Sequence, residues 1–272
     1  TNLTNIVLDI YFVVVLDWAV AGAAWASLIA DYTALIFAAT LVIKLSKKQG
    51  IELAVSNWFS VKKMADLLSL NRDIFIRSLI LQLCFSFMTF YAARIGETTL
   101  AANAVLLNFL MLVSFALDGI AYATEAKVGH AKGQQSVKMI TLWVKISVFW
   151  GMLFGLAYSV FFALLGSYII TLLTNVPEVI STATEYLPWV IALPLLAMSC
   201  FLFDGVFVGL TRAKDMRNSM LFSATVGFFG VFWIFNELQN NGLWLAMSCF
   251  MLMRGVTLII KYQRLKENNK LL

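Results

Sequence analysis

The chain has 272 residues, is 61% hydrophobic and only 13% charged, and has a mean hydropathy of +0.85. A soluble domain is about half apolar and about a quarter charged, so this composition excludes an ordinary soluble protein and makes lipid the main solvent of the chain. The net charge of +5 is compatible with nucleic-acid binding, but the placement of the basic residues predicts a membrane topology instead, and no nucleic-acid partner is expected.

Eight hydrophobic segments follow one another along the chain. The first, residues 3–16, would form about 21 Å of helix, which is short for a hydrocarbon core of about 30 Å. It indicates a chain that begins within a transmembrane helix, or a short re-entrant helix. The other seven have near-spanning lengths and predict an all-α polytopic membrane protein. They are residues 19–45, 74–93, 99–123, 140–165, 186–210, 220–235 and 243–262.

Positive charge alternates between the two ends of these segments. Sixteen of the 20 Lys and Arg residues lie in every second connection or in the C-terminal tail, while the opposite loops hold none, although Arg94 borders one of them. Loops rich in Lys and Arg stay in the cytoplasm. The pattern therefore predicts a multi-pass protein of the cell inner (plasma) membrane with a cytoplasmic C-terminus.

The connection after residue 45 predicts an amphipathic helix, because its apolar residues fall roughly on one face. Such a helix can lie at the membrane interface or pack on protein, and periodicity does not separate the two. We expect a linker at 46–71 that joins an N-terminal part, 1–45, to a bundle of six helices, 72–272.

Two apolar segments carry a carboxylate in similar surroundings, in FALDGIAYATEAKVGHAKG and FLFDGVFVGLTRAKDMRN. Asp118 and Asp204 each precede a glycine and lie well before a basic loop. A charged side chain at the centre of a transmembrane helix costs about 2.5–3.5 kcal/mol and usually faces a bundle interior or an aqueous cavity. We expect these acids to take up cations or protons. The alternative is a purely structural role in interhelical hydrogen bonds or buried ion pairs, for which Arg77, Lys145 and Arg254 are candidate partners.

Catalytic and metal-binding patterns are missing from the sequence. There is no HExxH, GxSxG or GxxxxGK[ST] motif, the three cysteines are isolated, and there is one histidine. We therefore expect neither an enzyme nor an ATP-driven pump, and neither a metal site nor a cofactor.

Several stretches are similar to one transporter family. Residues 96–133, which end in VGHAKG, resemble the eighth-helix region of multidrug and toxic compound extrusion (MATE) transporters. The stretch from Asp204 through GLTRAKDMRNS resembles their tenth helix and the loop that follows, and LNRDIFIRSLILQLCFSF is most similar to the DinF-type branch.

This resemblance implies twelve helices in two lobes. The chain would then cover the end of helix five, helix six, the interlobe linker and the complete C-terminal lobe, helices seven to twelve. Helices one to four would be missing partners within the same protein. Transporters built from such repeats rock one half against the other around a central site.

The resemblance also implies efflux of organic cations or amphipathic drugs and toxins in exchange for H⁺ or Na⁺. Asp204 matches the tenth-helix acid implicated in cation coupling in some branches, and Asp118 is the second candidate coupling acid. No counterpart of the seventh-helix acid of sodium-coupled members is found, which favours H⁺ over Na⁺ as the coupling ion. The principal acid of proton-coupled members would lie in the missing first helix. The residues expected to line the substrate cavity are Gln82, Phe85, Met88, Asn103 and Asn108.

Two other functions stay open. A lipid-linked saccharide flippase of the same superfamily would need more cationic residues in its cavity. The other is a membrane scaffold or a truncated product that has no transport activity of its own. Aromatic and Met side chains such as Phe85 and Met88 also fit ordinary packing between helices or against lipid.

Overall fold

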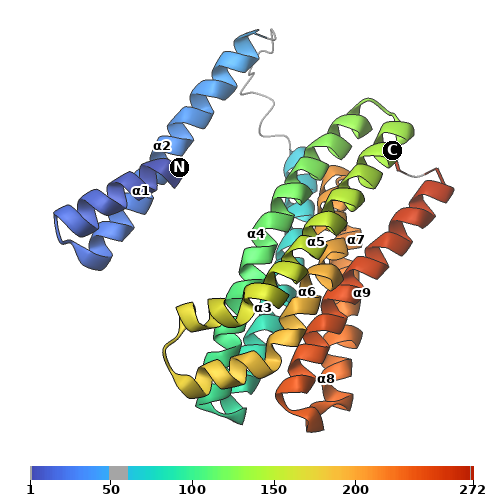
Figure 1. Ribbon diagram of the computed structural model, residues 1–272. Helices are drawn as coiled ribbons and strands as arrows, with labels where there is room; N and C mark the ends of the chain where they lie inside the picture. The colour runs from blue at the N-terminus through green and yellow to red at the C-terminus, as the bar shows by residue number, and fades with distance from the viewer. Residues whose placement is uncertain (1, 49–60, 270) are drawn as a thin grey trace. The chain divides into compact units, whose positions relative to one another are not determined.

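The computed structural model describes residues 2–48, 61–269 and 271–272 and divides the chain into two units, Thr1–Met64 and Ala65–Leu272 (Figure 1). The described residues contain helices and no strands, and six of these helices are long and apolar enough to cross a membrane. The chain is thus an all-α polytopic membrane protein, as the sequence predicts.

The first unit is a helical hairpin. Helix α1, Asn2–Asp9, continues as a π-helical segment, η1, Ile10–Val15, and α2, Ala19–Lys48, returns beside it (Figure 1). Phe12 stacks on Trp18 at the turn, with 5.3 Å between ring centroids. Gly22 lies against the backbone of Phe12, where a Cβ atom would be only 3.0 Å away, so the absence of a side chain lets the two arms approach closely.

The second unit is a bundle in which each long apolar segment forms one helical run. The run formed by α7, η3 and α8 contains a π-helical stretch in its middle. The elements are α3, Val61–Ile95, whose first four residues are counted in the first unit; α4, Glu97–Gly133; α5, Val137–Leu173; α6, Pro177–Gly209; α7, Ala213–Phe222; η3, Ser223–Gly230; α8, Val231–Ile234; the short η4, Asn236–Leu238; and α9, Asn240–Glu267.

The expected linker is only partly visible. Residues 49–60 lie outside the described residues, and from Val61 onwards the chain already belongs to α3, which runs on through the apolar segment. An amphipathic helix at the membrane interface therefore remains a prediction for this stretch.

Close packing of α4 against α6 places the two predicted acids on neighbouring helices. Gly205 and Gly209 lie four residues apart on α6, and a Cβ atom on either would collide with the α4 backbone, at the carbonyl oxygens of Ala121 and Glu125 respectively. Small residues at this spacing let transmembrane helices approach closely. Asp204 directly precedes this contact, so the packing holds it close to the part of α4 that carries Asp118.

Candidate functional site

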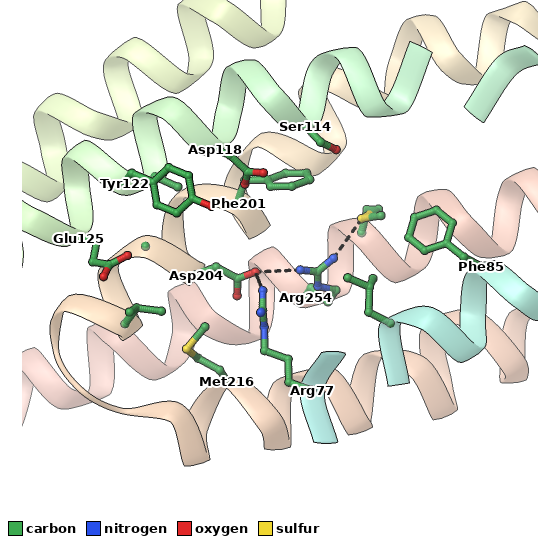
Figure 2. Close-up of a pocket in the computed structure, with 15 residues that line it drawn as sticks. Arg77, Phe85, Ser114, Asp118, Tyr122, Glu125, Phe201, Asp204, Met216 and Arg254 are labelled. Carbon is green, nitrogen blue, oxygen red and sulfur yellow. Dashed lines mark hydrogen bonds and ion pairs between the residues drawn. The ribbon is translucent and has the colours of Figure 1, made fainter. Parts of the chain in front are cut away.

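A cavity of about 390 Å³ lies within the second unit between α3, α4, α6, α7 and α9 (Figure 2). Asp204, Asp118 and Phe85 are on its wall, so the structure brings together three of the residues predicted from the sequence. Five charged side chains line it, three acidic and two basic, which gives the wall a formal charge of −1 when all are ionised.

Asp204 is held by two arginines from two other helices (Figure 2). Oδ2 of Asp204 accepts a hydrogen bond from Arg254 of α9 at 2.8 Å and another from Arg77 of α3. Asp204 is 9% exposed and Arg254 only 3%. The ion pair that the sequence left as an alternative is therefore present, with both Arg77 and Arg254, while Lys145 lies exposed on α5 and does not line the cavity.

The Arg254 guanidinium is fixed on more than one side. One nitrogen donates to the sulfur of Met251 at 3.3 Å, and the group lies 5.4 Å from the centre of the Phe250 ring. Arg77 is less completely satisfied, because its Nε is buried and has no hydrogen-bond partner among the described residues. Arg254 is therefore the rigid partner of Asp204, and Arg77 retains an unused donor.

The α4 side of the cavity carries acids without cationic partners. Asp118, Tyr122 and Glu125 lie on one helical face because they are spaced four and three residues apart. Figure 2 shows them across the cavity from Arg77 and Arg254. Within the described parts of the chain, neither Asp118 nor Glu125 forms an ion pair with Lys, Arg or His. The cavity thus places two free carboxylates opposite one neutralised carboxylate.

A second ion pair joins α3 to the bundle one turn before Arg77. Asp73 is 5% exposed and accepts a hydrogen bond from Arg217 of α7 at 2.6 Å. Asp73 and Arg77 are four residues apart and so project from the same side of α3. Charged contacts to α6 and α7 therefore hold this part of α3.

The other end of α3 is held by aromatic packing instead. Phe87 contacts Phe228, Phe229 and Phe232 edge to face, with centroids 5.1–5.9 Å apart. Met88 lies fully buried in the same core and does not line the cavity, contrary to expectation. Gln82 is exposed on α3 and is likewise outside the cavity wall.

The two predicted asparagines also lie away from the cavity. Asn103 is buried and exchanges hydrogen bonds of 2.7 and 3.1 Å with Asn240, and its side-chain oxygen also accepts from the Trp244 indole at 3.0 Å. Asn108 is exposed and donates to the Ala104 carbonyl of its own helix. Asn103 therefore connects α4 to α9 by hydrogen bonds, whereas the hydrogen bond of Asn108 stays within α4.

Four polar or aromatic wall residues were missed by the sequence analysis, namely Ser114, Tyr122, Glu125 and Phe201. Ser114 and Tyr122 lie four residues before and after Asp118, so helical periodicity extended from this acid would have found both. No three His, Cys, Asp or Glu side chains of the described residues form a group that could hold a metal ion.

Comparison with known proteins places the chain in one family. The protein-family model MatE matches residues 74–233, which include both predicted acids and Arg77. Over 266 residues, 97% of the chain, the sequence is 40% identical to DNA damage-inducible protein F of Escherichia coli and covers 57% of that protein. It is 26% identical to Protein DETOXIFICATION 43 of Arabidopsis thaliana over 94% of the chain and 48% of that protein. The chain thus spans about half the length of the curated relatives it matches.

The fold agrees with this assignment. The chain superimposes with a TM-score of 0.86 on a multidrug resistance MATE family transporter of the MOP superfamily in its outward-facing conformation, at 20% identity, covering 98% of this chain and 61% of that one. Identity at this level shows the fold alone. The family model, by contrast, covers more than half of the chain, and the resemblance predicted from the sequence is confirmed: this chain belongs to the MatE family.

Proposed function

We propose that the protein containing this chain exports organic cations or amphipathic drugs by proton-coupled antiport with alternating access. The single observation that carries this proposal is the acid-lined cavity inside a membrane-spanning bundle, where Asp118 and Glu125 on α4 have no ion-pair partner among the described residues. An unpaired carboxylate at this depth is costly unless it binds something, and both a proton and an organic cation relieve that cost. The solved outward-facing MATE transporter supports the proposal through its fold.

Competition between the two ligands would provide the coupling. A cation that binds beside Asp118 requires the ionised carboxylate, whereas a proton on the same carboxyl removes that attraction. If the proton-loaded and cation-loaded forms favour opposite orientations of the lobes, uptake of one ligand drives release of the other. Asp204 is the second coupling acid in this proposal, because protonation would release Arg77 and Arg254, and Arg77 connects α3 to the cavity.

Orientation in the membrane is part of the same proposal. The basic connections would face the cytoplasm of the cell that holds the protein in its inner membrane, with the C-terminus on the same side. Reporter fusions after the C-terminal residue and within the loop between α5 and α6 test it. Opposite accessibility of the two sites, with the C-terminus inside, is expected, and the reverse arrangement would contradict the topology.

The flippase alternative receives no support from the cavity. Its two basic residues, Arg77 and Arg254, are both engaged by Asp204, so neither is free to neutralise a lipid phosphate.

A direct test of the antiport proposal reconstitutes the intact native polypeptide into liposomes with an imposed proton gradient and follows a fluorescent lipophilic cation. Asp118→Asn should uncouple cation flux from the gradient, whereas Glu97→Gln, at the start of the same helix and outside the cavity, should not. Equal gradient dependence in both variants would refute the proposal.

A further inference from the structure

A second cavity, of about 440 Å³, opens between α4 and α5 on the opposite face of α4 from the acid-lined site. Gly119, Ala123 and Lys127 line it from α4, about half a turn around the helix from Asp118 and Glu125. Among the described residues, no atom of another part of the chain lies within 4 Å of the point where a Gly119 side chain would begin, so the missing side chain leaves open space. This groove is therefore separate from the proposed transport site.

Apolar surface dominates the groove. Trp143, Trp150 and Phe154 form its α5 wall, and Trp150 and Phe154 are 47% and 40% exposed. Its two buried hydroxyls are both hydrogen-bonded within the protein, because Thr124 donates to Ser147 at 2.6 Å and Ser147 donates to the Trp143 carbonyl at 2.8 Å. Both helices are long and apolar enough to span a membrane, so a lipid acyl chain is an apolar occupant that matches this surface.

One charged side chain marks the end of the groove. Lys127 Nζ lies 5.0 Å from the centre of the Trp143 ring, and Lys127 forms no ion pair with any acid in the described residues. Lys127 precedes the end of α4 at Gly133 by six residues, and Trp143 follows the start of α5 at Val137 by six, so both lie roughly 9 Å from the connecting loop. Lys and Trp at this depth are typical of the lipid headgroup level.

The electrostatic surroundings favour an anion. Glu125, the nearest acid in the α4 sequence, lines the opposite cavity. The nearby cations are Lys138, exposed in the first turn of α5, and Lys132, whose ammonium group is occupied by the Leu210 carbonyl at 2.7 Å. Basic pockets between transmembrane helices at the cytoplasmic side are a recognised form of anionic lipid site.

We propose that this groove binds an anionic phospholipid, with its phosphate at Lys127 and one acyl chain along Gly119, Trp150 and Phe154. Charge complementarity selects the headgroup and the apolar walls hold the chain. The bound lipid would pack against the back of the helix that carries Asp118. The site does not depend on transport, so it can be tested by binding alone.

Brominated acyl chains quench tryptophan fluorescence on contact and provide the assay. The intact protein is placed in nanodiscs that contain brominated phosphatidylglycerol or brominated phosphatidylcholine, and the signal of Trp150 is isolated by subtracting a Trp150→Phe variant. Phosphatidylglycerol should half-saturate the quenching at about fivefold lower mole fraction, which corresponds to about 1 kcal/mol for one lysine beside an anionic surface.

Three variants separate this site from a general surface charge effect. Lys127→Gln should abolish the headgroup preference, Lys127→Arg should retain it, and Lys138→Gln, at the same end of the helices but outside the groove, should leave it unchanged. Equal potency of the two lipids, or an unaltered preference in Lys127→Gln, would overturn the proposal. Inorganic phosphate provides a further test. If it relieved the quenching by brominated phosphatidylglycerol but not the quenching by brominated phosphatidylcholine, Lys127 would be part of a site for free phosphate, and the proposal would also be overturned.

Discussion

Replacing Asp204 by Asn tests how much the ion pairs of Asp204 with Arg77 and Arg254 stabilise the helical bundle of the second unit. The variant keeps the shape of the side chain but leaves Arg254, only 3% exposed, and Arg77 without a countercharge. Removing one partner of a buried ion pair costs about 3–5 kcal/mol, because the remaining charge stays buried and unpaired. Arg254 carries most of this cost, since the side chain of Arg77 is 20% exposed and borders the cavity. We therefore expect Asp204→Asn to lower the free energy of unfolding by about 3–4 kcal/mol.

The assay is equilibrium unfolding of the intact protein in detergent, followed by circular dichroism. Asp215→Asn is the matched control, because Asp215 pairs with Arg212 and Lys261 at 3.3 and 3.0 Å in a more open position. Pairs of this kind contribute about 0–1 kcal/mol. The double variant Asp204→Asn with Arg254→Met removes the buried unpaired charge and should recover part of the loss. If Asp204→Asn were no less stable than Asp215→Asn, the ion pairs of Asp204 with Arg77 and Arg254 would not be a main source of the stability of the bundle.

The remaining predictions concern other contacts within the second unit and use the same unfolding measurement. Gly205→Val should lower the free energy of unfolding by about 1–3 kcal/mol, because the new side chain would meet the α4 backbone. Gly119→Ala adds a side chain in open space and should be nearly neutral, so equal effects of the two variants would contradict close packing at Gly205. Asn103→Ala should cost about 1–3 kcal/mol because it leaves its buried hydrogen-bonding partners unsatisfied, while Asn108→Ala should change stability by less than about 0.5 kcal/mol. Asp73→Asn should weaken the contact of α3 with Arg217 of α7 and speed amide hydrogen exchange in the N-terminal half of α3. Unchanged exchange there would contradict the inference that this ion pair holds α3 against the bundle.

The helices could be predicted from the sequence because lipid imposes a simple rule. A continuous apolar run of spanning length must satisfy its backbone groups internally, so each run becomes a helix wherever its neighbours lie. The same rule made Asp118 and Asp204 conspicuous, since charge is rare in such runs. Their positions on the cavity wall follow from helical periodicity and from the close packing at Gly205.

The partners of these residues required the structure. Asn103 bonds to Asn240, which lies 137 residues later, and no local pattern connects the two positions. A polar side chain in a spanning helix satisfies the energetic rule equally well by facing a cavity or by bonding to a neighbouring helix. The rotation of each helix against its neighbours decides between these outcomes. For this reason the sequence alone did not show that Phe85 lies on the wall of this cavity while Asn103 and Met88 are buried between helices.

Proton release on substrate binding tests the central claim most directly. A lipophilic organic cation is added to the purified intact protein in weakly buffered detergent solution that contains a pH-sensitive dye. Wild-type protein is expected to release protons as the cation saturates its site, and Asp118→Asn and Asp204→Asn should each release fewer, while Glu97→Gln should match the wild type. Undiminished release from both aspartate variants would contradict a coupling role for the cavity between α3, α4, α6, α7 and α9.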